Sequence, residues 1–295
     1  MDGGYYRSKQ VIAFLVPALV FFLAFNTYPL IEAFRMSFYN WNIVRPENSQ
    51  FVGLANYMKA FSDPVFWTSM KNTVLYALVT VPAQMALGLL VAMFLNFNLP
   101  GTKVFRTIYY LPVISSWVVV SLLFRYLFNG EAGLVNYILV DLLQIFPSYV
   151  SWFRNASTAL FVIMLLGIWK GVGWSMVIFL AGLQGIPTEL REASMIDGAS
   201  SGQHFWQVVL PILRPTMGFV AIMLVIGGFN VFTSVFLVTG GGPLHRTEVL
   251  LTYMYYQGFE RLNFGYGAAL SYILGIIIFV ISVIQLRLFQ KPVEM

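Results

Sequence analysis

Long apolar runs constrain the fold of this chain more than any other feature of its sequence. A helix that crosses the hydrocarbon core of a bilayer needs about 20 apolar residues, and six stretches reach that length: residues 11–30, 72–95, 104–124, 159–183, 216–238 and 266–286. Hydrophobic residues make up 59% of the sequence and charged residues only 10%, whereas soluble domains carry about a quarter charged residues. We therefore expect an all-α integral membrane protein with six transmembrane helices.

The first apolar run follows two basic residues, Arg7 and Lys9, an arrangement that is also typical of a secretory signal peptide. The run is too long for the apolar part of a signal peptide, and no small-residue cleavage site follows it. It is therefore interpreted as a retained first span. Pro17, Pro82 and Pro112 lie inside three of the predicted spans and should kink those helices, because proline removes a backbone donor.

Six spans place both termini on the same side of the membrane. The basic residues do not decide which side this is, because inner and outer segments carry equal numbers of Lys and Arg if both termini are cytoplasmic. The inner loops of that arrangement are shorter and therefore denser in positive charge, as cytoplasmic loops usually are.

A polar stretch punctuated by glycine, residues 185–215, separates the fourth and fifth apolar runs. Thr188 is a candidate N-cap for a short helix with Glu189 in its first turn, near the positive end of the helix dipole. The polar composition and the position between two spans predict that this stretch is a folded loop at the membrane surface.

The same loop contains signals for a break and a second helix. Asp197 and Gly198 predict a turn that stops the first helix, with Gly198 at a positive φ that strains residues with a Cβ. A second helix is expected over residues 203–210, and Pro211 should end it. The loop is thus predicted to fold as a helix, a glycine break and another helix.

Nine residues of this loop match a family motif at fixed spacing: Glu192, Ala193, Ser194, Asp197, Gly198, Ala199, Val208, Leu210 and Pro211. They resemble the EAA loop of bacterial ABC-importer permeases, which reads Glu-Ala-Ala, three residues, Gly, nine residues, Ile, one residue and Leu-Pro. Ser194 replaces the second alanine and Val208 replaces isoleucine, and both changes are small or isosteric. A connector without a partner would explain two helices and a turn but not this spacing.

The resemblance implies a type I ABC-importer permease fold with a cytoplasmic coupling helix and both termini in the cytoplasm, in the cytoplasmic membrane of a bacterium or archaeon. Residues 1–70 would hold the first transmembrane helix and an outer loop, and residues 71–290 the permease core. All of the nine loop residues except Val208 are implied to couple the chain to an ATPase. The implied partners are a second homologous permease, a cytoplasmic ATPase dimer that binds ATP and Mg²⁺, and an extracytoplasmic solute-binding protein, all at a lipid bilayer.

The outer loop expected at residues 32–70 is rich in aromatic residues and resembles the segment that precedes the core of sugar permeases. We expect a lid of short interfacial helices anchored by Trp41, Tyr57 and Trp67 at the depth of the lipid headgroups. Such a lid is compatible with docking of a binding protein.

The fourth span carries Lys170, the only charged residue near the middle of a predicted helix. An ionisable side chain inside the membrane normally faces a water-filled cavity or a partner. Snorkelling is disfavoured because Lys170 lies about ten residues, or about 15 Å, inside the span. Trp174 follows one turn later and shares its face. Two alternatives stay open: both residues line the solute pathway, or Trp174 packs against lipid or a helix and Lys170 meets a carbonyl of the partner permease.

The fifth span and the turn after it resemble the larger permease subunits of maltose-type transporters. The resemblance rests on GGFNVF at residues 227–232, on IWKGVGW in the fourth span, and on TGGGP at residues 239–243 with Thr247. It implies a solute pathway lined by Lys170, Gly171, Trp174, Gly227, Gly228 and Val231. Asn230 is the one amide in the run, and we add it to this set because amides bond hydroxyl groups. The residue types differ from those of maltose permeases, so the solute should differ from maltose or be held differently.

Several kinds of chemistry lack their residues in this sequence. No Walker A motif is present, so ATP should bind to another subunit. The only histidines, His204 and His245, lie far apart in loops, and no predicted span contains Asp or Glu. A metal site, a membrane enzyme and a proton-coupled carrier are therefore disfavoured. The net charge of +5 comes without a Lys/Arg run, so nucleic acid is not an expected partner.

The sequence therefore predicts a permease subunit, not an enzyme, that binds no cofactor itself and imports a sugar or oligosaccharide using ATP hydrolysis in a separate subunit. A permease for another polar solute, such as a glycerol phosphate ester, is the alternative. A self-sufficient carrier or channel is a further one.

Overall fold

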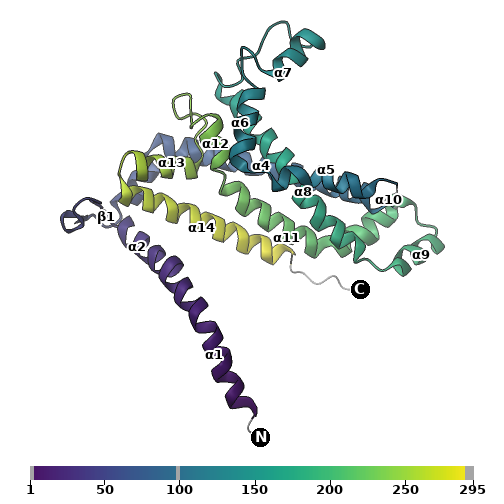
Figure 1. The fold of residues 1–295 in the computed structure, drawn as a ribbon, viewed down its shortest axis with the longest axis horizontal. Coiled ribbons are helices and arrows are strands. Elements are labelled where there is room, and N and C mark those ends of the chain that lie inside the picture. Colours follow the sequence, from purple (N-terminus) through teal and green to yellow (C-terminus); the bar gives the residue numbers. More distant parts are fainter. Residues whose placement is uncertain (1–2, 98–99, 290–295) are drawn as a thin grey trace. The chain divides into compact units, whose positions relative to one another are not determined.

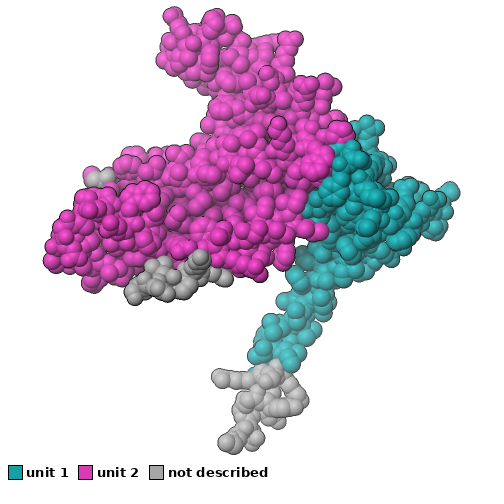
Figure 2. All heavy atoms as spheres, turned by 180° about the vertical axis from the view of Figure 1, so that it is seen from behind, with its two compact units in different colours: residues 1–63, 254–273 teal, residues 64–253, 274–295 magenta. Residues whose placement is uncertain are grey.

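The computed structural model describes residues 3–97 and 100–289, which are mostly helical (Figure 1). The chain forms two compact units, residues 1–63 with 254–273 and residues 64–253 with 274–295 (Figure 2). Five helical segments are long and apolar enough to cross a membrane, and one bent pair of helices is a sixth candidate if it counts as one span.

The first unit begins with a long apolar helical segment. α1 (Gly3–Phe22), a π-helical turn (Leu23–Thr27) and α2 (Tyr28–Ser37) follow one another without a break, and Gln10–Ser37 is a candidate span. No residue in its most apolar window is buried within the described chain. The faces of this helix are therefore available to lipid or to another subunit.

The segment after α2 differs from the expected lid at residues 32–70. It contains β1 (Tyr39–Asn40), a 3₁₀ turn (Pro46–Asn48), β2 (Gln50–Phe51) and α3 (Ala55–Ser62). β1 and β2 pair antiparallel, with Tyr39 opposite Phe51. The side-chain oxygen of Asn42 accepts from two backbone N–H groups further along the chain, and this local turn favours a hairpin over another helix. The ends of the predicted loop belong to α2 and α4.

The last elements of the first unit come from residues 254–273. These residues include the end of α13 (Leu250–Tyr255), a π-helical turn (Tyr256–Glu260) and the start of α14 (Phe264–Phe289). The hydroxyl of Tyr266 donates to the Asp63 carboxylate at 2.8 Å, and the Lys59 ammonium lies 4.4 Å from the Tyr266 ring centroid. These contacts tie the start of α14 to the end of α3.

The second unit contains the helices that build the site. They are α4 (Pro64–Asn96), α5 (Thr102–Ile114), α6 (Trp117–Leu127), α7 (Leu134–Asn136), α8 (Ala156–Gln184), α9 (Thr188–Ile196), α10 (Ser201–His204), α11 (Leu210–Phe229) and α12 (Thr233–Val238), with π-helical turns at Tyr137–Leu142 and Phe205–Val209. The domain boundary predicted at residue 70 falls inside α4.

Small residues allow α4 and α8 to pack closely. A Cβ at Gly167 would collide with the hydroxyl of Tyr76. One turn later, a Cβ at Gly171 would collide with the amide of Gln84. Glycine at four-residue spacing is a common way for membrane helices to approach each other. Here it also leaves room for two polar side chains of α4.

The third predicted span, residues 104–124, is not one helix. α5 ends at Ile114, α6 begins at Trp117, and the two helices are bent by 95° relative to each other. Pro112 has no N–H for the last turn of α5. Ser116 accepts from the backbone N–H of Val118 and so caps α6, which is a favourable helix start. A kink was expected at Pro112, but the helix instead ends two residues later, at Ile114.

The fifth predicted span is also interrupted. Ser201–Val238 is a candidate span, but its helical backbone stops at Phe229 and resumes at Thr233. Phe232, immediately before α12, has a φ of −137° and a ψ of −65°, outside the helical range. Both interruptions lie in the second unit.

Two clusters of buried apolar side chains stabilise the second unit. Along α8, the first cluster ends at Leu166 and the second begins with the buried Met176. Residues 167–175 lie between them, and this stretch contains the buried Lys170.

Candidate functional site

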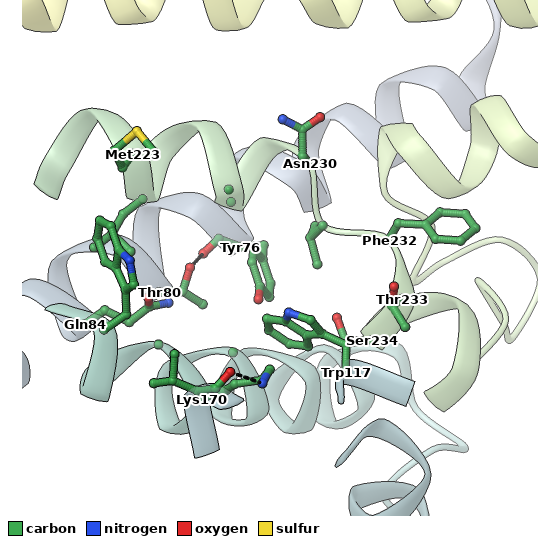
Figure 3. A pocket seen from close by; sticks show the side chains of 18 residues that line it. Tyr76, Thr80, Gln84, Trp117, Lys170, Met223, Asn230, Phe232, Thr233 and Ser234 are labelled. Atoms are coloured by element: carbon green, nitrogen blue, oxygen red, sulfur yellow. Dashed lines mark hydrogen bonds between the residues drawn. The ribbon is translucent and has the colours of Figure 1, made fainter. Parts of the chain in front are cut away.

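A cavity of about 480 Å³ lies in the second unit between α4, α8 and α11, beside both helix breaks (Figure 3). Its volume falls within the range of about 300–1,000 Å³ that is usual for small-molecule sites. All seven residues predicted for the solute pathway line it: Lys170, Gly171, Trp174, Gly227, Gly228, Asn230 and Val231. The structure therefore brings these residues together, and their contact with a solute stays a prediction.

Gly227, Gly228 and Asn230, at the end of α11, differ in what they contact. A Cβ at Gly227 would meet no atom within 4 Å, whereas one at Gly228 would lie 3.3 Å from the Cβ of Ala77. Gly227 is therefore open to the cavity, and Gly228 packs against α4. The amide of Asn230 donates to the Ile226 carbonyl at 2.9 Å and is directed away from Tyr76 and Trp117 (Figure 3).

Lys170 lies in the wall of the cavity, but its ammonium group is occupied. The residue is only 4% exposed. Its Nζ donates to the backbone carbonyls of Pro112, Val113 and Ser115. One of the two alternatives left open by the sequence paired Lys170 with a carbonyl of the second permease, whereas the structure provides three carbonyls from the same chain.

Trp174 both lines the cavity and packs on a neighbouring helix. Its ring centroid lies 6.4 Å from that of Phe219 on α11. Lys170 and Trp174 share one face of α8, as their spacing predicted. The packing and pathway interpretations of Trp174 are therefore compatible.

Several cavity residues escaped sequence analysis: Tyr76, Thr80, Gln84, Trp117, Thr233 and Ser234. The first three were detectable, because polar side chains recur at every fourth residue from Tyr76 to Gln84 of α4. Trp117 and Ser234 gave no such signal, since only the helix breaks bring them to the cavity.

Ser234 has an unusual environment for a polar side chain. It is 1% exposed, and its hydroxyl has no hydrogen-bond partner in the described part of the chain. An unpaired buried hydroxyl is costly, and this one lies beside Trp117 at the cavity (Figure 3). Its hydroxyl is therefore an unsatisfied polar group next to the cavity.

The polar loop at residues 185–215 folds as a helix, a glycine break and a helix, as predicted. Gly198 has a φ of +74°, which confirms its expected conformation. The N–H of Gly198 donates to the Met195 carbonyl, and the N–H of Ala199 donates to the Ser194 carbonyl. This pair of bonds is the Schellman motif that satisfies the end of a helix.

The backbone N–H groups at the start of the next helix, α10, are also hydrogen-bonded. The Ser200 hydroxyl accepts from the Gln203 N–H, and the Gln203 side chain accepts from the Ser200 N–H, which together form a capping box. Ser194 and His204 are hydrogen-bonded at 2.8 Å across the break. These local bonds hold the two helices together without a partner.

Two local predictions for this loop were wrong. Thr188 is the first residue of α9 and Pro187 occupies the N-cap position, without a side-chain bond; proline there already sets an extended backbone. Pro211 does not end a helix but lies in the first turn of α11, after the π-helical turn Phe205–Val209. Proline is tolerated in a first turn because its missing N–H is not needed there.

Most residues of the predicted coupling set are accessible. Glu192, Ala193, Asp197 and Gly198 are exposed, and Ala199, Leu210 and Pro211 are half-buried. Ser194 is buried against His204. Ile196, an apolar residue of α9, is 86% exposed.

Three parts of the chain lie at the same end of the second unit. A second cavity, of about 530 Å³, is lined by Phe97 at the end of α4 and by Ala199 and His204 of the polar loop. Arg214, near the end of the loop, donates to the Leu288 carbonyl near the end of α14 at 3.0 Å. The end of α4, the loop and the end of α14 are therefore neighbours within the second unit.

The described residues do not provide a metal centre. In residues 3–97 and 100–289, no three His, Asp or Glu side chains are grouped so that they could hold a metal ion. A cavity at two helix breaks, together with a folded polar loop at one end of a bundle of apolar helices, is typical of membrane transport subunits.

Comparisons with known proteins agree with this class. A family model described as the binding-protein-dependent transport system inner membrane component matches residues 84–291. The probable ABC transporter permease protein YurN of Bacillus subtilis (strain 168) is 36% identical over 95% of this chain and 96% of its own length. The arabinooligosaccharides transport system permease protein AraP of the same organism is 36% identical over 97% of this chain and 90% of its own.

A solved structure shares the fold. The crystal structure of a bacterial ABC transporter involved in the import of the acidic polysaccharide alginate contains a chain that matches with a TM-score of 0.84, at 22% sequence identity and over 98% of both chains. The chain described here belongs to the family of binding-protein-dependent transport system inner membrane components.

Proposed function

We propose that this chain is the membrane-spanning subunit of an ABC importer and that a sugar or oligosaccharide crosses the membrane through the cavity at the helix breaks. The observation that carries the proposal is the convergence of two interrupted helices on one cavity. Irregular backbone at membrane depth is tolerated where it lines a cavity or is buried in protein, and transporters place their sites at such interruptions. The name of AraP, which specifies arabinooligosaccharides, supports a glycan.

The chemistry of the cavity favours a neutral glycan. Trp117 and Trp174 offer ring faces for sugar rings, and Gln84, Thr233 and Ser234 offer hydrogen bonds to hydroxyls. Among the described residues that line the cavity there is no carboxylate, and the one cation has all its donors on backbone carbonyls. An anionic solute such as a glycerol phosphate ester would find no free counter-charge there.

The polar loop is the proposed contact with the ATPase, which would bind ATP and Mg²⁺ in place of this chain. Glu192 and Ile196 are exposed on α9, and the loop is folded without a partner. We place this loop and both termini in the cytoplasm. The hydrogen bond between the loop and the end of α14 supports that arrangement for the C-terminus. A second permease would complete the pathway, and an extracytoplasmic binding protein would deliver the solute.

Reconstitution tests this function directly. Purified alone in lipid vesicles, the chain should move no sugar. Together with its second permease, ATPase and binding protein, it should take up sugar only when ATP is supplied. The measurement is the uptake of labelled oligosaccharide with and without ATP. Sugar flux through the chain alone would instead establish a self-sufficient carrier.

Replacing Ser234 with alanine should separate function from stability. The Ser234 hydroxyl is buried and unpaired, so its removal should leave the unfolding temperature unchanged or raise it. Loss of a neutral hydrogen bond to the solute, worth about 0.5–1.5 kcal/mol, should slow uptake at limiting solute by about 2- to 13-fold. Uptake is compared with that of Ser282→Ala, because Ser282 is half-buried with a buried, unpaired hydroxyl and does not line the cavity. Equal uptake by the two variants would exclude Ser234 from the pathway.

A further inference from the structure

We propose that Lys170 is a positioning residue that holds the break between α5 and α6 and thereby sets Trp117 in the cavity wall. This inference rests on the cavity being the solute site proposed above. It differs from a role in solute binding, because it assigns the ammonium group to the backbone of this chain.

The hydrogen bonds of Lys170 satisfy the end of α5. A helix that stops inside a membrane protein leaves its last carbonyls without N–H partners, and such groups are costly away from water. The Nζ atom lies 2.7 Å, 3.2 Å and 2.6 Å from the carbonyl oxygens of Pro112, Val113 and Ser115, respectively. An ammonium group has three N–H donors, so this contact uses all of them. A solute hydroxyl would have to displace one of these bonds.

The end of α5 also compensates the charge. Lys170 is buried, and no carboxylate in residues 3–97 and 100–289 forms an ion pair with it. The C-terminus of a helix carries a partial negative charge, and the three carbonyls present this charge to Nζ. Buried charges in membrane proteins are commonly stabilised by backbone carbonyls in this way.

The same ammonium group contacts the first residue after the break. Its Nζ lies 4.9 Å from the ring centroid of Trp117, a cation–π distance, and Figure 3 shows the two side chains together at the cavity. Trp117 begins α6. Lys170 therefore bridges the last turn of α5 and the first turn of α6, which fixes both the bend and the tryptophan ring.

A unique cysteine can report on this break. The sequence contains no cysteine, so Val113→Cys places the only thiol of this subunit in the cavity wall, next to the break. In the assembled importer, the rate at which a membrane-impermeant methanethiosulfonate reagent modifies this subunit is measured without solute or ATP. The readout does not depend on transport.

Lys170→Met should speed the modification by about tenfold or more, because each lost charge-assisted hydrogen bond changes an opening equilibrium by about one to two decades and water must reach the freed carbonyls. Lys170→Arg retains a cation with several donors and should stay within about threefold of the parent rate. Lys103→Met is the matched control. Lys103 is exposed at the N-terminal end of α5, the helix that carries Val113, and this variant should react at the parent rate.

Two results would overturn the proposal: a parental rate in Lys170→Met, or an equally fast rate in Lys170→Arg. If Lys170→Met does not assemble, Lys170→Gln takes its place, and it should react faster than Lys170→Arg because it lacks the charge. A solute-binding role for Lys170 predicts slower uptake with unchanged modification rates. The modification rates therefore decide the role of Lys170, while the uptake of Ser234→Ala separately tests whether the solute contacts the cavity wall.

Discussion

Replacing Gly227 with leucine should block solute uptake while leaving the fold intact. No atom lies within 4 Å of a Cβ at this position, and leucine favours a helix over glycine by up to about 1 kcal/mol. The added side chain would extend into the cavity of about 480 Å³. A solute forced past it would meet overpacking of about 1–3 kcal/mol, which corresponds to about 5- to 150-fold slower passage. The measurement is ATP-driven uptake by the reconstituted importer.

Two other glycines provide controls for this change. Gly275 of α14 also has no atom within 4 Å of a Cβ and does not line the cavity, so Gly275→Leu should transport normally. Gly228→Leu would press on Ala77 of α4 and should lower the unfolding temperature. If Gly227→Leu transports as well as Gly275→Leu, the pathway does not pass this face of α11.

Replacing Gly198 with valine should weaken the coupling between this chain and its ATPase. The residue has a φ of +74°, where a Cβ costs about 1–2 kcal/mol and a β-branched side chain costs more. The turn of the Schellman motif would then shift, and α9 would no longer be held in place against α10. We expect a several-fold loss of solute-stimulated ATP hydrolysis and a loss of uptake, with normal insertion into the membrane.

Strain and side-chain bulk can be separated at this loop. Asparagine tolerates positive φ better than other residues with a Cβ, so activity should fall in the order Gly198→Asn, Gly198→Ala, Gly198→Val. Gly202→Val places the same side chain in α10, where φ is not positive and a Cβ meets no atom within 4 Å. This variant should remain more active than Gly198→Val. Normal ATPase stimulation in Gly198→Val would contradict the proposed coupling role.

The sequence predicted the features that depend on local chemistry. The helix, glycine break and helix around Gly198 follow from turn residues close together in the chain. The grouping of Lys170 with Gly227 followed from a resemblance over two motifs, and both residues line one cavity.

The features that sequence analysis missed depend on tertiary contacts. The apolar run at residues 104–124 contains no polar interruption longer than Ser115-Ser116, so its composition alone suggests one continuous span. The break is stable because Lys170, 57 residues after Val113, donates to the carbonyls of Val113 and Ser115 at the end of α5. Pro211 was missed for a local reason: a π-helical turn precedes it, and the helix continues through a residue that usually stops one.

The hydrogen bonds within the polar loop have a mechanical consequence. Ordering the backbone of a flexible residue costs about 1–2 kcal/mol, so a loop that folded only on docking would dissipate much of the interaction energy of its partner. The Schellman motif, the capping box and the bond between Ser194 and His204 remove this cost in advance. A displacement of α9 by a partner would therefore move the loop and the helices attached to it as one rigid body. Little of the interaction free energy would be spent on ordering the loop.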